Sequence, residues 1–247
     1  MDILSGVKIV RQALYFSKQK ALVLGDTHIG YEEALNKEGI MIPRLHLKEI
    51  ISALDSVFED EKIKSGGLKL IVLLGDVKHE FGTISRQEWK DTLALIDYLT
   101  ARAKLVILKG NHDTILGPIA DKKNVEVRKH LLLGDFLFCH GDKLLDEKSS
   151  EFHKAKTIVI GHEHPAISIR DGVRVERYKC FLLGKYGKKA LIVLPSFNFI
   201  TEGTDVLQQK LLSPFIKDVS GFRAFIVADK AYDFGKIKSL LSRFEKE

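Results

Sequence analysis

The chain has 247 residues, which suits one large domain or one domain with a small appendage. Its hydrophobic content of 45% and charged content of 29% are ordinary for a globular protein. No apolar run approaches the roughly 18 residues of a membrane span, and residues 1–6 lack the regions of a signal peptide. The composition therefore predicts a soluble cytoplasmic protein with a single domain, residues 1–247, and no membrane partner.

The formal net charge is +6, from 39 Lys and Arg against 33 Asp and Glu, and the pI is about 9.1. This charge favours anionic partners such as phosphates or nucleic acid, although the basic residues are spread along the chain. The two cysteines, Cys139 and Cys180, lie in apolar runs. They are therefore predicted to be buried reduced thiols rather than a disulfide or metal ligands.

Strands and helices alternate in the first half of the chain. The sequence predicts a β-hairpin that leads into a strand, and then three helices, at residues 7–24, 31–38, 43–64 and 86–102. The third region has apolar residues at three-to-four spacing and ends at a Gly-Gly pair, and Ser85 is a plausible N-cap of the fourth. Apolar runs at residues 70–75 and 105–108 separate the helices, a pattern typical of parallel βαβ units. The first half is therefore predicted to be α/β.

Hairpins dominate the second half. Strand pairs or single strands are predicted at residues 131–138, 166–175, 181–194 and 222–228, and a closing helix at residues 237–244. The clearest hairpin has Asp171-Gly172 between alternating apolar residues, a pair that favours a tight turn. No low-complexity linker separates the two halves.

Five apolar runs end in short polar blocks. The blocks are Gly25-Asp26-Thr27-His28, Gly75-Asp76 with His79, Gly110-Asn111-His112-Asp113, His140-Gly141-Asp142 and Gly161-His162-Glu163-His164. Ligands of open α/β sheets bind at the carboxyl ends of strands, so the five blocks are expected to converge. Six of the nine histidines fall in these blocks beside carboxylates, which core packing does not explain. The pattern predicts a metal site.

Imidazole, carboxylate and amide ligands without a thiolate suit Mn²⁺, Fe²⁺, Zn²⁺ or Co²⁺. The ligands are too many for one ion and about right for two. Two ions about 3.5 to 4 Å apart stabilise both the attacking and the leaving oxygen of a phosphoryl displacement. One carboxylate must then bridge the ions, and Asp76 is the best candidate.

The order of these blocks resembles the full motif set of the calcineurin-like metallophosphoesterases. The spacing Gly75-Asp76-x-x-His79 is closer to the Mre11/SbcD nuclease branch of that superfamily. The Gly39-Ile40-x-Ile42-Pro43 segment, the block of residues 75–81 and Leu194-Pro195-x-Phe197 resemble the prokaryotic ICC-like, or DNA-ligase-associated, phosphoesterases.

The resemblance implies a four-layer αββα sandwich of two mixed β-sheets. It implies two divalent ions, with Mn²⁺ favoured over Fe²⁺, Zn²⁺, Co²⁺ or Ni²⁺, and in-line attack by a hydroxide between them. One ion would be held by Asp26, His28, Asp76 and His164, and the other by Asp76, Asn111, His140 and His162. His112 would be the acid or phosphate-contacting residue, and Asp113 would orient its imidazole.

Further candidates for substrate contacts are less defined. His79 is a candidate for a substrate-side group or for a structural role, and Lys78 for a phosphate contact or for a solvated lysine. Ser196, Asn198 and Glu202 follow the rigid Pro195 and are candidates to reach the pocket from the second sheet.

The leading hypothesis is therefore a two-metal phosphoesterase, with a phosphodiesterase or nuclease preferred over a phosphomonoesterase or nucleotidase. The alternative is a metal-bearing interaction scaffold, because a retromer subunit uses this fold without evident catalysis. An acid such as His112 beside the metals argues against a scaffold. Expected partners are a phosphoester substrate, possibly nucleic acid, and, by family resemblance alone, a DNA ligase or helicase.

Overall fold

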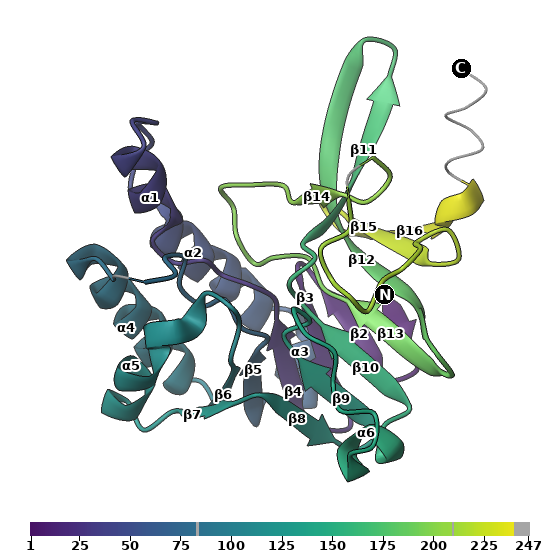
Figure 1. Cartoon of the computed structure of the whole chain (residues 1–247), viewed down its shortest axis with the longest axis horizontal. Helices are drawn as coiled ribbons and strands as arrows, with labels where there is room; N and C mark the ends of the chain where they lie inside the picture. The colour runs from purple at the N-terminus through teal and green to yellow at the C-terminus, as the bar shows by residue number, and fades with distance from the viewer. Residues whose placement is uncertain (83, 209, 240–247) are drawn as a thin grey trace.

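Two β-sheets stacked face to face form the centre of the computed structural model, which describes residues 1–82, 84–208 and 210–239 (Figure 1). The first sheet has seven strands in sequence order. They are β1 (Asp2–Leu4), β2 (Val7–Val10), β3 (Ala13–Phe16), β4 (Ala21–Leu24), β5 (Leu70–Leu73), β6 (Lys104–Leu108) and β7 (Glu126–Arg128). Strands β1 to β4 pair antiparallel and β4 to β7 parallel, so the sheet is mixed.

The second sheet has nine strands, in the order β14-β11-β12-β13-β10-β9-β8, with β15 between β12 and β16. They are β8 (His130–Leu133), β9 (Phe136–Cys139), β10 (Thr157–Ile160), β11 (Pro165–Asp171), β12 (Arg174–Tyr186), β13 (Lys189–Val193), β14 (Thr204–Asp205), β15 (Arg223–Val227) and β16 (Ala231–Lys236). Strand β10 runs parallel to both β9 and β13, whereas the hairpins pair antiparallel. This sheet is also mixed.

Helices cover the outer face of the first sheet. The helices of the molecule are α1 (Tyr31–Lys37), α2 (His46–Phe58), α3 (Glu61–Gly66), α4 (Arg86–Thr100), α5 (Leu116–Lys122), α6 (Ser150–Lys154) and the 3₁₀ turn η1 (Asp113–Ile115). The alternation of side chains along β4 shows how the layers form, because Leu22 and Leu24 pack with α2, α4 and α5 while Val23 packs against the second sheet.

The outer face of the second sheet is covered by α6 and by an irregular segment, residues 206–208 and 210–222. Phe152 of α6 and Phe215, Ile216 and Phe222 of that segment share a buried cluster with β9, β10 and β13. The predicted four-layer arrangement of two mixed sheets is therefore confirmed, although the fourth layer is mostly irregular chain.

Most predicted elements lie where the sequence placed them, and two boundaries are wrong. The helix predicted over residues 43–64 is two helices, because the Asp60 side chain accepts a hydrogen bond from the Lys62 N–H and begins α3. The turn predicted at Asp171-Gly172 lies one residue later, since Asp171 still pairs with Arg174. Of the closing helix predicted at residues 237–244, residues 240–244 lie outside the described part of the chain.

Two further observations concern the whole chain. Within the described residues, no helix combines the length and the apolarity that crossing a membrane requires. Cys139 and Cys180 are both buried free thiols, as predicted, and burial raises the pKa of each well above its usual range.

Candidate metal centre

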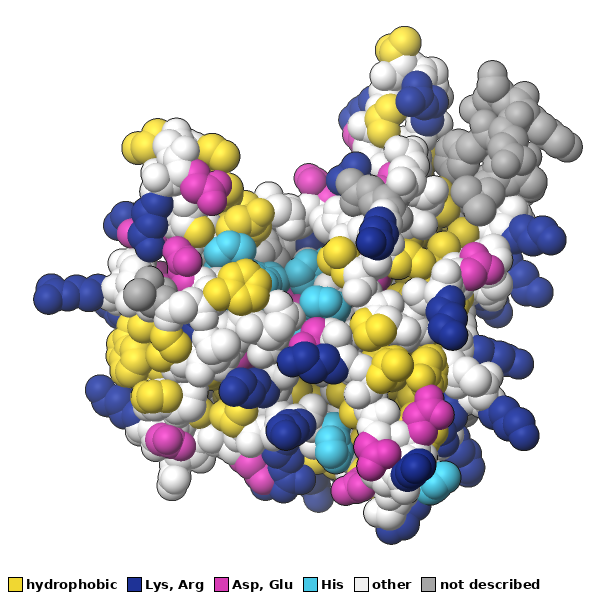
Figure 2. Space-filling view, viewed as in Figure 1, with side chains coloured by type: hydrophobic (Ala, Val, Ile, Leu, Met, Phe, Trp, Pro, Cys, Tyr) yellow, Lys and Arg dark blue, Asp and Glu magenta, His cyan; other side chains and the backbone are white. Residues whose placement is uncertain are grey.

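The five polar blocks follow strands that end at one edge of the sandwich. Strands β4, β5 and β6 are parallel neighbours, and so are β9 and β10 in the facing sheet. Backbone hydrogen bonds continue past the strand ends: the His28 N–H donates to the Asp76 carbonyl and the Gly161 N–H to the His140 carbonyl, both at 2.9 Å. Figure 2 shows several histidine side chains gathered near the middle of the face viewed. The predicted convergence of the strand ends is thus present.

One group of possible ligands comes from β4 and β10. Asp26, His28 and His164 each offer one atom, and these atoms lie within 4.8 Å of one another. Asp26 Oδ2 is 2.8 Å from His164 Nε2, and the nearby imidazoles lower the pKa of Asp26 although its burial opposes this. His28 Nδ1 is buried with no hydrogen-bond partner. Such an orphaned nitrogen beside a carboxylate fits a cation ligand.

A second group comes from β5, β6, β9 and β10. Asp76, His140 and His162 offer atoms within 4.8 Å of one another. His140 Nε2 lies 3.3 Å from Asp76 Oδ2, 3.0 Å from Asn111 Oδ1 and 3.2 Å from His162 Nδ1. Because three predicted ligands lie within 3.3 Å of the Nε2 atom of a fourth, the arrangement fits a metal site.

The tautomer of His140 strengthens this interpretation. Its Nδ1 lies 2.8 Å from the Leu74 carbonyl, which can only accept, so Nδ1 carries a proton. In the neutral His140 ring, Nε2 then carries no proton, and its lone pair faces the Asp76 and Asn111 oxygens. Burial lowers the pKa of His140, but the charges of Asp26 and Asp76 outweigh it and raise the pKa to about 10. The position therefore favours a cation, either a proton or a metal ion.

The backbone of the site is strained. Seven non-glycine residues in the described chain have positive φ, and four of them are predicted ligands. The four are His28 (φ 46°), Asp76 (φ 45°), His162 (φ 61°) and His164 (φ 48°). Positive φ is uncommon for such residues and persists where the surrounding structure enforces it, often at functional sites.

His112 and Asp113 do not form the predicted pair. The His112 Nδ1 contacts the His79 carbonyl, and its Nε2 lies 3.8 Å from Asp76 Oδ2. The carboxylate of Asp113 instead accepts hydrogen bonds from the N–H groups of Val77 and Gly110, both at 3.0 Å. The prediction that Asp113 orients the His112 imidazole is therefore wrong. Asp113 ties the loop after β5 to the loop after β6, and its burial raises its pKa to about 6.

The His79 side chain lies beside the predicted ligands, whereas the Lys78 side chain points into the interior. His79 forms a third group with His28 and His112, with ligand atoms within 4.8 Å, and its ring stacks on Tyr31 at a centroid distance of 4.1 Å. Burial and the charge of His112 lower its pKa to about 4. Lys78 is completely buried and donates to the Glu80 carbonyl, so its expected contact with substrate is wrong. An ammonium held in the interior cannot meet a phosphate in the site.

The residues after Pro195 are also engaged within the protein. The Asn198 side chain is buried, and its oxygen accepts a hydrogen bond from the Ile200 N–H at 2.7 Å. Ser196 Oγ lies 2.7 Å from Lys179 Nζ, whereas Glu202 is exposed. Contact of Asn198 with substrate stays a prediction.

Three neighbours of the site were not predicted from the sequence. The Glu163 carboxylate, between two predicted ligands, accepts hydrogen bonds from the N–H groups of Leu212 and Ser213, both at 2.8 Å. Phe81 is 55% exposed with its ring centroid 3.6 Å from that of His112. Burial lowers the pKa of Lys179 to about 7. The position of Glu163 between two histidines in the sequence could have indicated that it lies near the site. No local sequence pattern indicates this for Phe81 or Lys179.

The chain is similar in sequence and structure to known proteins. A family model described as calcineurin-like phosphoesterase matches residues 20–194. The structure of the nuclease MPE of Pseudomonas putida is 20% identical, with a TM-score of 0.62, and the match covers 90% of this chain and 92% of that one.

Other solved structures are less similar. A predicted phosphoesterase of Streptococcus pneumoniae TIGR4 is 14% identical with a TM-score of 0.34, and the vacuolar sorting protein 29 of Cryptosporidium parvum is 13% identical with a TM-score of 0.38. Each match covers 87% of this chain and 97% of the other. No curated protein matches the chain. The match to the family model covers well over half of the chain, which therefore belongs to the calcineurin-like phosphoesterases, hydrolases that act on phosphoester bonds.

Proposed function

We propose that the protein is a phosphodiesterase that works with two divalent metal ions. The observation that carries this proposal is the pair of adjacent ligand groups, Asp26-His28-His164 and Asp76-His140-His162. The groups are neighbours because His140 Nδ1, in the second, lies 3.8 Å from Asp26 Oδ2, in the first. Asn111 completes the second group, and Asp76 is the proposed bridge.

The donor set fits borderline divalent ions, since it combines imidazole nitrogens with carboxylate and amide oxygens and contains no thiolate. Mn²⁺ is the proposed native ion. Bound ions of this kind acidify water and stabilise charge on the attacking and leaving oxygens of a phosphoryl displacement. The protein contributes the fixed positions of the ligands, and the surrounding structure holds four of them in a strained backbone conformation.

His112 is the proposed acid for the leaving oxygen. The His79 carbonyl can only accept, so the contact with His112 Nδ1 places a proton on that nitrogen. The second nitrogen, Nε2, must then carry the proton that is transferred, which makes the imidazolium the active form. The backbone N–H of His112 also donates to Asp76 Oδ1 at 2.8 Å, so the backbone of the proposed acid is fixed relative to the proposed bridging ligand.

The preference for a diester rests on two features of the surroundings. The exposed Phe81 ring beside His112 gives an apolar surface next to the site, which suits the second organic group that a diester carries and a monoester lacks. The net charge of +6 favours an extended anionic substrate.

The test is hydrolysis by metal-stripped protein reloaded with Mn²⁺, Zn²⁺, Co²⁺, Ni²⁺ or Fe²⁺. We expect cleavage of bis-p-nitrophenyl phosphate and of single-stranded DNA that requires added metal and is greatest with Mn²⁺. Under the same conditions p-nitrophenyl phosphate and nucleoside monophosphates should react more slowly. Hydrolysis of monoesters alone would overturn the diester preference, and no hydrolysis of any ester with any of the five metals would overturn the proposed function.

A further inference from the structure

A pocket with both polar and apolar lining opens beside the proposed metal centre. It has a volume of about 600 Å³, and its walls come from the ends of β6 and β9, from the residues around β7 and β8, and from residues 141–146. Asn111 and His140 of the second ligand group form part of its lining, so the pocket is continuous with the position of the proposed second ion. A group bound in this pocket would therefore be a neighbour of the reacting phosphate.

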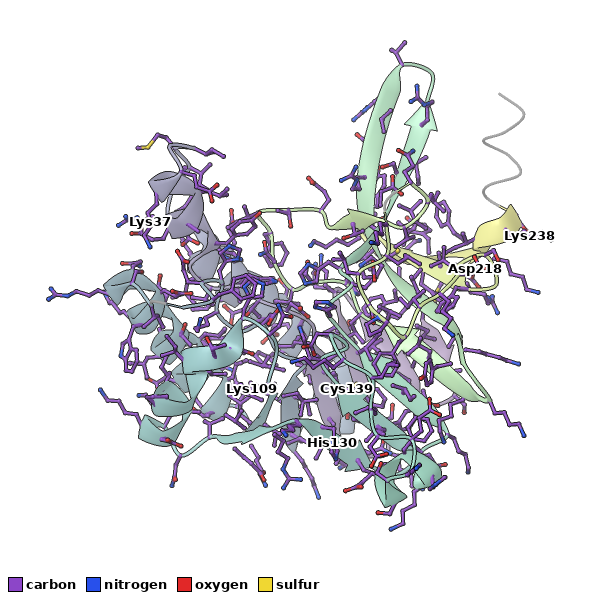
Figure 3. The ribbon with its side chains drawn as sticks, in the orientation of Figure 1. Lys37, Lys109, His130, Cys139, Asp218 and Lys238 are labelled. Carbon is purple, nitrogen blue, oxygen red and sulfur yellow. The ribbon has the colours of Figure 1, made fainter. Side chains whose placement is uncertain are left out.

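Lys109 and Lys129 supply unpaired positive charge to this pocket. Both side chains are exposed, and the hydrogen bond from the Lys109 N–H to the Arg128 carbonyl, at 2.7 Å, keeps the two lysines on adjacent strand ends. Across the described ranges 1–82, 84–208 and 210–239, no carboxylate lies within ion-pair distance of either ammonium. Figure 3 labels Lys109 and His130 on the face of the molecule that carries the site. Both ammonium groups are therefore available to an anion.

The pocket also contains carboxylates. Lys143 lies 3.6 Å from the carboxylate of Asp142 and compensates its charge. Asp146 accepts a hydrogen bond from the Lys148 backbone N–H at 2.9 Å, which leaves its negative charge in place. Lys109 and Lys129 together outweigh this one carboxylate, so the lining has a net positive charge.

An exposed aromatic ring lies on the other side of the proposed acid. Thr114 lines the pocket, and its hydroxyl donates to the Phe81 carbonyl, while the exposed Phe81 ring packs against His112. Proteins that bind single-stranded nucleic acids combine exposed aromatic rings with basic side chains, because bases stack on the rings while phosphates meet the ammonium groups.

We propose that this pocket binds the phosphate adjacent to the scissile one in a nucleic-acid strand, through Lys109 and Lys129. The inference rests on the proposed function and specifies its substrate as a polynucleotide strand with at least two phosphates. The two lysines are specificity residues rather than catalytic ones. They contact neither the ligand groups nor the reacting atoms, and they add binding energy only when a second phosphate is present.

The experiment compares thymidine dinucleotides that differ in one phosphate. TpT has only the internal diester, and pTpT and TpTp carry a second phosphate on the 5′ or the 3′ side. A charge-assisted hydrogen bond to phosphate contributes about 1.5 kcal/mol, so we expect kcat/KM for pTpT or for TpTp to exceed that for TpT by about tenfold. The doubly substituted variant Lys109→Gln with Lys129→Gln should lose this advantage. Its hydrolysis of bis-p-nitrophenyl phosphate, which has one phosphate, should be unchanged.

A matched control removes the same charge elsewhere. Lys122 at the end of α5 and Lys188 in the turn between β12 and β13 are exposed and lie outside the pocket. The variant Lys122→Gln with Lys188→Gln should keep the preference for the second phosphate. With a dT octamer, the dependence of log KM on log salt concentration should become shallower by about 0.7, the value for one lost phosphate contact, and only in the pocket variant.

Two results would overturn the inference. The first is a wild-type protein that shows no advantage for either phosphorylated dinucleotide, or a pocket variant that keeps the advantage. The second is a loss confined to a dinucleoside diphosphate, TppT, which would assign the lysines to a pyrophosphate rather than to a strand. Failure of the proposed function itself would differ, because bis-p-nitrophenyl phosphate would then not be hydrolysed by any variant.

Discussion

Gly110 gives the Asp76 carboxylate its space. A Cβ at this position would lie 2.1 Å from Asp76 Oδ1 and 2.4 Å from the Asp76 backbone nitrogen. Gly110→Ala should therefore displace the proposed bridging ligand and weaken Mn²⁺ binding by about 10- to 100-fold, the loss typical when the support of a ligand is removed. Isothermal titration of metal-stripped protein with Mn²⁺ measures this.

Gly117 of α5 is the matched control for this substitution. Its Cβ would meet no atom of a distant residue, so Gly117→Ala should leave Mn²⁺ affinity unchanged. Equal Mn²⁺ affinities of the two alanine variants would contradict the assignment of Asp76.

His112 and Asp76 should separate catalysis from metal binding. His112→Ala removes the proposed acid and should lower kcat by about 10²- to 10⁴-fold while Mn²⁺ still binds. Asp76→Asn should lose both turnover and metal affinity, because an amide cannot replace the bridging charge. The measurements are metal content after dialysis and kcat with bis-p-nitrophenyl phosphate. Unchanged hydrolysis in both variants would show that the site is misassigned.

At the scale of elements, the start of α4 holds the loop that carries His79. The Ser85 Oγ accepts a hydrogen bond from the Glu88 N–H at 3.0 Å, and the Glu88 carboxylate accepts from the N–H groups of His79 and Glu80 at 3.0 and 2.9 Å. The cap therefore fixes both the helix and a loop of the site.

Ser85→Ala should lower the free energy of unfolding by about 1 kcal/mol through loss of the cap. Ser52, exposed in the interior of α2, is the control, since Ser52→Ala places the best helix former at a position without a cap and should leave stability equal or slightly higher. Urea unfolding of both variants measures the difference. A Ser85→Ala variant as stable as Ser52→Ala would show that the cap contributes nothing.

For the whole molecule, the convergence of strand ends links folding to metal binding. A ligand that binds only the folded state stabilises it, and Mn²⁺ at 100 times its dissociation constant should add about 2.7 kcal/mol to the free energy of unfolding. A chelator should reverse the gain, and Asp76→Asn should show little of it. Thermal or urea unfolding with and without Mn²⁺ provides the test, and equal shifts in wild type and Asp76→Asn would place the ion elsewhere.

Lys179 should impose a pH dependence on stability. Burial lowers its pKa to about 7, whereas an unfolded lysine has a pKa of about 10.4. Between these values the unfolded chain binds more protons than the folded one, so stability rises with pH across this window, by at most about 1.4 kcal/mol per unit. Below pH 7 both states hold the proton and the slope vanishes.

Lys179→Met should remove this rise, measured as the free energy of unfolding in urea at pH 7, 8 and 9. Lys185→Met, at an exposed position of the same strand, is the control and should follow the wild type. If Lys179→Met keeps the wild-type slope between pH 7 and 9, the rise has another source.

The sequence by itself predicted the five strand ends and the proposed ligand residues on them, and its family resemblance implied the four layers. The strand ends follow from a local rule, because an apolar run that ends in glycine and polar residues marks the end of a strand. The boundary between α2 and α3 was missed because the helical spacing of apolar residues continues across Asp60, whose capping contact is seen only in the structure.

Only the tertiary structure decided the directions of single side chains near the site. Asp113 stands next to His112 in the chain but accepts hydrogen bonds from Val77 and Gly110, and Lys78 points into the interior. The pocket lysines come from separate strand ends that only the paired sheet brings together. Such contacts depend on packing between distant segments, which a local pattern of residues does not specify.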